Sequence, residues 1–163
     1  LLNGILGEGM SSRLFLEIRE KRSLAYDIHS YPQYFQYFGS LIVYAGVDPK
    51  KLELALEAIL EELAKLRARI SPKEMAKARE FFKGRMLLRL EDTRSMAGFL
   101  GGQELMNHQI QTVEEILARL EAITGEELEA LARNLIQRSK LNLAVVGPSV
   151  AAERLEKILN NFN

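Results

Sequence analysis

The sequence of 163 residues contains no cysteine and only two histidines. Without cysteine the chain has no disulfide, no thiol nucleophile and no cysteine-bound zinc. This absence fits any compartment and favours a reducing one, such as the cytoplasm, only slightly. His29 and His108 lie far apart, and neither belongs to an H-x-x-E-H or H-E-x-x-H motif. We therefore expect no metal site in this chain.

The chain also lacks an excess of charge of either sign, with 22 basic and 22 acidic residues. A nucleic-acid-binding protein usually carries a basic excess, so we expect no nucleic-acid partner. There is no run of 18 apolar residues, so we expect no span of a membrane. The composition is typical of a soluble globular protein, and the length fits a single domain over residues 1–163.

Local patterns predict a helix and then two strands in the first third of the chain. The helix follows the glycine-rich turn 7–9, with Ser11 or Ser12 as its cap, and ends near Arg22 or Ser23. Segments 25–35 and 39–47 are rich in aromatic and β-branched residues. They predict an antiparallel pair of strands in which Pro32 marks an edge or a bulge.

The remainder is predicted to be mainly helical. Four capping signals mark helix starts, at Asp48–Pro49, Ser71–Pro72, Thr112 and Thr124. Segment 93–107 predicts a helix that is interrupted or ended at Gly101–Gly102. Segment 141–148 predicts a buried strand, and segment 149–162 predicts a closing helix. On the helix that follows Asp48, we expect the acidic residues near Lys65, such as Glu61 and Glu62, to lie on a solvated face.

This order predicts an α+β fold, with an antiparallel or mixed sheet and helices packed on one face. Three strands make a thin sheet, and the first residue is Leu1 rather than methionine. We therefore expect the chain to be a truncated part of a longer protein.

Three short patterns resemble known kinds of site. Asp27 and His29 share a strand face and could supply two metal ligands, although an ordinary exposed strand face is the simpler interpretation. Segment 7–13 could hold a phosphate before a helix, but it lacks the P-loop lysine. A turn that allows close approach of a backbone or partner is favoured there. Ser30 lies in no G-x-S-x-G motif, which argues against a serine hydrolase.

Arg19 and Tyr26 flank the predicted junction between helix and strand. At neutral pH a guanidinium and a phenol are both hydrogen-bond donors. Side by side, they could hold a peptide carbonyl or the oxyanion that forms from it. The alternative is a surface arginine and a strand tyrosine with no joint role.

The segment "LGEGMSSRLFLEIREKRSLAY" closely resembles the signature of the C-terminal half of the pitrilysin, insulinase and mitochondrial processing peptidase family of zinc metallopeptidases. The resemblance continues through segments 44–63, 70–93, 100–105 and 141–148. It therefore covers nearly the whole chain with long motifs.

The resemblance implies two similar halves around a chamber, of which the N-terminal half binds zinc and the C-terminal half binds no metal. It implies that Arg19 and Tyr26 contact the backbone of a peptide or protein substrate near the scissile bond, with Gly7, Gly9 and Met10 as weaker substrate-binding candidates. The cofactor zinc would belong to the companion half-domain or subunit. This chain alone is then expected to hydrolyse no peptide and to contribute no catalytic residue of its own.

The sequence departs from the family signature at two positions, and several other roles of the chain stay open. Glu8 stands where the family signature usually has glycine, so we expect a stiffer and more acidic loop, which would favour basic peptides. Ser23 also replaces a frequent glycine. The chain could instead be an inactive partner subunit of a heteromeric peptidase, a structural scaffold, or an α+β interaction module. A homodimer also stays open.

Overall fold

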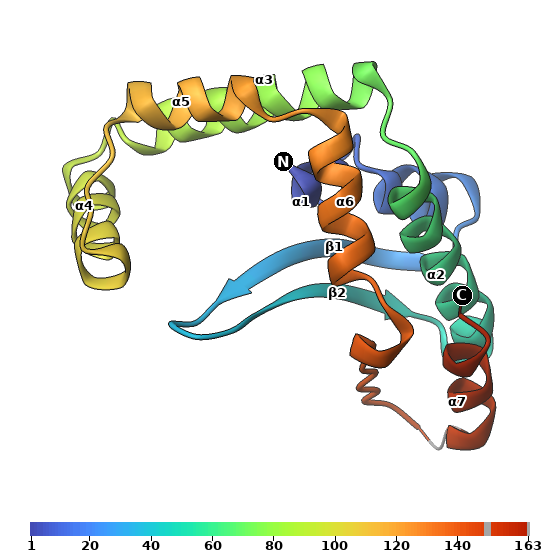
Figure 1. Cartoon of the computed structure of the whole chain (residues 1–163). Coiled ribbons are helices and arrows are strands. Elements are labelled where there is room, and N and C mark those ends of the chain that lie inside the picture. Colours follow the sequence, from blue (N-terminus) through green and yellow to red (C-terminus); the bar gives the residue numbers. More distant parts are fainter. Residues whose placement is uncertain (149–150, 163) are drawn as a thin grey trace.

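The computed structural model describes residues 1–148 and 151–162, which form a helix-rich α+β fold around one β-hairpin (Figure 1). This confirms the predicted fold class. No helix within these residues is both long and apolar enough to cross a membrane. In chain order the elements are α1 (Leu2–Leu6), the π-helix η1 (Phe15–Lys21), β1 (Ala25–Tyr34), β2 (Gly39–Val47), the 3₁₀ turn η2 (Pro49–Lys51), α2 (Leu52–Ala68), α3 (Pro72–Arg89), α4 (Thr93–Asn107), α5 (Val113–Ala122), α6 (Gly125–Leu135), the 3₁₀ turn η3 (Arg138–Lys140) and α7 (Ala152–Asn160).

Strands β1 and β2 pair antiparallel, as predicted, with Ser30 opposite Val43 and Pro32 opposite Leu41. The N–H of Ser30 donates to the carbonyl of Gly7 at 3.0 Å and therefore points away from β2. Backbone groups two residues apart on a strand point the same way, so the nitrogen of Pro32 also faces this outer edge. The missing N–H of Pro32 thus removes no bond between the two strands, which confirms its predicted edge position.

Helices cover one face of the hairpin. Along β1, buried Ile28 and Ser30 alternate with exposed Asp27 and half-buried His29. The core lies where this face meets α1, η1 and α2, and the tip of the hairpin extends beyond it below α3 and α5 (Figure 1). The largest fully buried side chains are Leu6, Leu14, Ile18 and Leu66.

The predicted capping signals are confirmed at four helix starts. A side-chain oxygen at each cap accepts a backbone N–H in the first turn, and three of the caps are complete capping boxes: Asp48, Ser71 with Glu74, Thr112 with Glu115, and Thr124 with Glu127. The predicted cap at Ser11 or Ser12 is wrong, because η1 has no side-chain cap. The hydroxyl of Ser12 donates instead to the carbonyl of Gly9 at 2.8 Å.

Helix α4 runs without a break through Gly101 and Gly102, so the predicted interruption is wrong. A glycine inside a helix costs only about 1 kcal/mol relative to alanine. The N-cap of α4 is Asp92, whose carboxylate accepts the N–H groups of Arg94 and Ser95. Two glycines therefore weaken this helix without ending it.

The predicted strand at 141–148 is not formed, and its apolar side chains Leu143, Val145 and Val146 are exposed. A strand requires a neighbouring strand for its hydrogen bonds. Within the described residues β1 and β2 pair only with each other. The predicted closing helix corresponds to α7, and residues 149 and 150 of that prediction lie outside the described residues.

Glu62 is buried, with 2% of its surface exposed, so its predicted place on a solvated face is wrong. Helix α2 packs against both α6 and α7, and this widens its buried side beyond one apolar stripe. The carboxylate of Glu62 is 2.5 Å from the Nζ of Lys65, which compensates the buried charge. Glu61, by contrast, is exposed and accepts a hydrogen bond from Arg22 at 2.6 Å.

Candidate functional site

Arg19 lies on a helix that has π rather than α geometry. A π-helix closes its turns with hydrogen bonds to the fifth residue back, and such segments occur frequently at functional sites. The helix ends at Arg22, as predicted, and Ser23 then adopts a left-handed conformation with φ of 50°. The N–H of Leu24 bonds to the carbonyl of buried Ile18 at 2.9 Å. This closure directs the chain from the helix straight into β1.

Tyr26 is the extra residue of a β-bulge at the start of β1. Ala25 pairs with Val47 and Asp27 pairs with Gly46, so Tyr26 has no partner on β2. Its side chain is 86% exposed. Bulges redirect side chains and are common beside active sites. The bulge therefore presents the phenol to solvent rather than to the sheet.

The structure brings Arg19 and Tyr26 into contact. The Cζ atom of Arg19 lies 5.7 Å from the ring centroid of Tyr26 and 4.9 Å from that of Phe15. Both distances suit cation–π attraction. The nearest carboxylate is that of Glu20, 3.9 Å from the Nε of Arg19. Among the described residues, neither the guanidinium of Arg19 nor the hydroxyl of Tyr26 makes a hydrogen bond, so both keep donors for a ligand.

An open pocket of about 720 Å³ lies beside this pair. Its wall includes Asp48 and Lys51, which the sequence analysis did not assign to the site. The Nζ of Lys51 donates to the carbonyl of Ser23 at 3.1 Å and fixes the junction between helix and strand. Pairing of the predicted strands could have revealed these residues, because an antiparallel hairpin returns the end of β2 to the start of β1.

The glycine-rich loop lies farther along β1, next to Ser30. A Cβ atom on Gly7 would lie 2.5 Å from the Oγ of Ser30, so only glycine fits there without a shift. Gly9 has φ of +87°, a conformation that residues with a Cβ rarely adopt. Gly7 thus allows the close approach of a backbone that the sequence pattern favours over phosphate binding, and Gly9 allows the turn of the loop. Met10, at the tip of the same loop, is 78% exposed.

Gly7 and Gly9 line a second cavity, of about 550 Å³, which shares no residue with the pocket at Arg19. Ser30, which contacts Gly7, follows Tyr26 by four residues on the same strand. At about 3.3 Å per residue, this is a separation of roughly 13 Å. The predicted site residues therefore form two groups along β1, not one cluster.

Glu8 does not make the loop acidic in the way that the sequence suggested. Its carboxylate forms an ion pair with Arg85 and accepts a hydrogen bond from the Nδ2 of Asn3 at 2.9 Å. The negative charge is thereby compensated within the fold.

The described residues do not fit a zinc site. Asp27 and His29 do approach each other, with 3.4 Å between Oδ1 and Nδ1. The imidazole also stacks on Tyr44, with 5.0 Å between the ring centroids. No group of three or more histidine, cysteine, aspartate or glutamate side chains in residues 1–148 and 151–162 is placed to hold a metal ion.

Comparison with known sequences gives one family and a set of longer relatives. The family described as "Peptidase M16 inactive domain" matches residues 1–82. The "Uncharacterized zinc protease YmxG" of Bacillus subtilis (strain 168) is 38% identical over 150 residues, which are 91% of this chain and 36% of the relative. The chain thus spans about a third of the length of this relative.

Solved structures agree with this match. A conserved protein from Enterococcus faecalis V583 is 30% identical with a TM-score of 0.71, over 81% of this chain and 31% of that one. The structure of a peptidase M16 inactive domain from Pseudomonas fluorescens has a TM-score of 0.75, over 83% of this chain and 32% of that one. At 23% identity, this second likeness concerns the fold alone.

Proposed function

Because the chain belongs to the peptidase M16 family and matches its inactive domain, as the resemblance in the sequence implied, we propose that it is the substrate-binding, noncatalytic half of a zinc-dependent endopeptidase. The companion half, on the same chain or on a separate subunit, would hold the zinc ion, which supplies an activated water for peptide hydrolysis. The observation that carries this proposal is the contact between Arg19 and Tyr26 at the mouth of an open pocket.

The two side chains would bind the substrate backbone as hydrogen-bond donors. The rings of Phe15 and Tyr26 restrict the guanidinium of Arg19 while its N–H groups stay accessible. A peptide carbonyl that lies over the pair accepts hydrogen bonds from the guanidinium and from the phenol of Tyr26. Donors that are already in place stabilise an oxyanion more than they stabilise the neutral carbonyl. The pair would thus both position the scissile bond and lower the barrier to its cleavage.

An inactive partner subunit of a heteromeric peptidase, or a scaffold without proteolysis, remains the alternative role. A subunit that grips substrate for a separate zinc-bearing subunit would need the same pair. A scaffold has no need of two side chains at a pocket whose donors make no hydrogen bond within the described residues, so the accessible Arg19 and Tyr26 favour substrate binding.

Replacing Tyr26 with phenylalanine in the complete protease tests the proposal. Loss of one oxyanion donor should lower kcat on the order of 10²-fold. Tyr37→Phe is the matched control, because Tyr37 lies 88% exposed near the tip of the hairpin, far from the pair in sequence. Turnover of a fluorogenic peptide is measured for both variants. An unchanged kcat for Tyr26→Phe would limit Tyr26 to packing and would remove the main support for the proposal.

A further inference from the structure

One face of α3 changes its chemistry along the helix. Ala78, Phe82, Arg85 and Arg89 follow one another at intervals of four, three and four residues, so they share this face. Ala78 is buried where α3 packs against α1. Farther along, the face lies over the cavity lined by Gly7 and Gly9. This face of α3 is therefore apolar at Ala78, where the helix packs on the core, and carries arginine beyond it.

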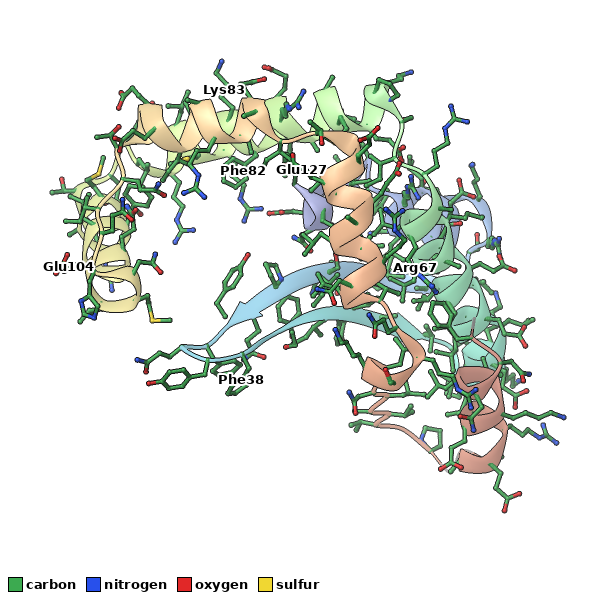
Figure 2. All side chains as sticks on the ribbon, viewed as in Figure 1. Phe38, Arg67, Phe82, Lys83, Glu104 and Glu127 are labelled. Carbon is green, nitrogen blue, oxygen red and sulfur yellow. The ribbon has the colours of Figure 1, made fainter. Side chains whose placement is uncertain are left out.

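Figure 2 shows the orientation of this face. Phe82 points from α3 into the space between the helix and the hairpin, whereas Lys83 points the opposite way. Phe82, Arg85 and Arg89 line the cavity of about 550 Å³ and also a neighbouring cavity of about 620 Å³, to which α4 adds Arg94. The two cavities together form one groove between the hairpin, α3 and α4, which we call the arginine groove.

The arginine groove carries uncompensated positive charge. Its walls include three arginines, and among the described residues that line it Glu8 is the only acidic one. Arg85 is paired with Glu8. In the described part of the chain, the guanidinium groups of Arg89 and Arg94 make no hydrogen bond and no ion pair. Arginine without a partner is rarely buried in an apolar interface, so this groove suits an acidic occupant rather than an apolar one.

Glu8 shows which ligand these arginines accept. It is a carboxylate on a loop that reaches across to Arg85 and is also held by Asn3. Arg89 lies one helical turn farther along α3, so a second carboxylate beside Glu8 would meet it in the same way. The planar guanidinium matches a carboxylate with two parallel hydrogen bonds.

We propose that the arginine groove binds an acidic segment of the peptide substrate, with substrate carboxylates on Arg89 and Arg94. This inference rests on the proposed function and adds a substrate class to it. Tyr31, which lines the groove, follows Tyr26 by five residues on β1. At about 3.3 Å per residue this is roughly 16 Å, the span of about five residues of extended peptide. The end of the arginine groove at Tyr31 therefore lies about five residues of extended peptide from the bond held at Arg19 and Tyr26.

Binding of matched peptides to the full chain tests this assignment. Fluorescently labelled peptides that carry glutamate, glutamine or lysine at the acidic positions, and are otherwise identical, are titrated in an anisotropy assay. The glutamate peptide should bind about five- to tenfold more tightly than the glutamine peptide, the range expected for two partly exposed ion pairs. The double variant Arg89→Glu with Arg94→Glu should lose this preference and favour the lysine peptide. Its affinity for the glutamine peptide should stay unchanged.

Lys83→Glu is the matched control, since it reverses a charge on the opposite side of α3. It should keep the preference for glutamate. If Lys83→Glu lost the preference for the glutamate peptide as fully as the double arginine variant does, only the net charge of the chain would matter. That result would overturn the inference. Equal binding of the glutamate and glutamine peptides would also overturn it, but would leave the proposed function standing if Arg19→Ala weakens both. If no peptide binds at all, the proposed function fails and this inference fails with it.

Discussion

Arg19 and Tyr26 meet because each stands at an irregularity of the backbone. The π geometry of η1 alters the direction of Arg19 relative to a regular helix, and the bulge frees Tyr26 from the pairing of β1 with β2. Ser23, with its left-handed conformation, makes the sharp turn between them. Three unusual backbone features within a short stretch thus serve one contact between two side chains.

Two glycine substitutions should have opposite effects on stability. Gly7→Ala should lower the free energy of unfolding by about 1–3 kcal/mol, because the added methyl group collides with Ser30. Gly102→Ala should raise it by about 0.5–1 kcal/mol, because Gly102 lies inside α4 with no atom within 4 Å of an added Cβ. Urea denaturation followed by circular dichroism measures both. A Gly7→Ala variant as stable as the unmodified chain would show that Ser30 moves aside easily.

At the scale of elements, Glu74 ties the start of α3 to the segment before η1. It completes the capping box with Ser71 at the start of α3. The same carboxylate accepts two hydrogen bonds from the guanidinium of Arg13, at 2.6 and 3.1 Å. Arg13 also donates to the carbonyl of Arg69 at 2.7 Å. The cap of one helix therefore anchors the loop that leads into another, which bears Arg19.

The stability of this junction should depend on pH. Partial burial acts to raise the pKa of Glu74, but hydrogen bonds from Arg13 and Ser71 outweigh it and lower that pKa to about 2. In the unfolded chain the pKa is close to its ordinary value of 4.5. The stabilisation is therefore complete above pH ~5 and is lost as the pH falls from about 4.5 to about 2.

Glu74→Gln measures this contribution. The variant should be less stable than the unmodified chain at neutral pH by about 1–2 kcal/mol. The difference should shrink as the pH is lowered toward 2, because protonation removes the same charge from Glu74. Urea denaturation at a series of pH values gives the difference. A difference that stays constant across this range would contradict the assigned role of the carboxylate.

At the scale of the whole molecule, the outer part of the hairpin is exposed. No charged residue lies between His29 and Asp48, and the tip carries the exposed aromatic residues Tyr34, Tyr37 and Phe38. The pocket at Arg19 lies at the base of this hairpin, and the arginine groove lies beside its outer part. The hairpin thus connects the two proposed contacts with substrate.

The chain by itself should neither cleave peptides nor respond to zinc. We expect no hydrolysis of a fluorogenic peptide with or without added zinc, since the described residues offer no set of ligands for the metal. A ligand that binds only the folded state raises Tm, so added zinc or a chelator should leave Tm unchanged. Peptidase activity that survives in a metal-free preparation, or a rise of Tm with stoichiometric zinc, would refute this expectation.

The sequence by itself determined the features that depend on neighbours within one or two helical turns. Four helix starts follow from caps whose partners lie two or three residues away. The hairpin follows from the aromatic and β-branched composition of two segments that are close together in the chain. The long signature around Arg19 and Tyr26 carried the family, which the match to the inactive domain confirms.

Only the tertiary structure decided features that depend on residues distant in sequence. Glu62 is buried because α6 and α7 both pack on α2, and segment 141–148 is no strand because no described strand lies beside it. The contact between Arg19 and Tyr26 depends on a bulge opposite Gly46 and Val47. The arginine groove depends on the packing of α3 against α1, which leaves a cavity between α3 and the hairpin. Each of these four features depends on contacts between segments that are far apart in the sequence. The spacing of residues within one segment does not determine such contacts.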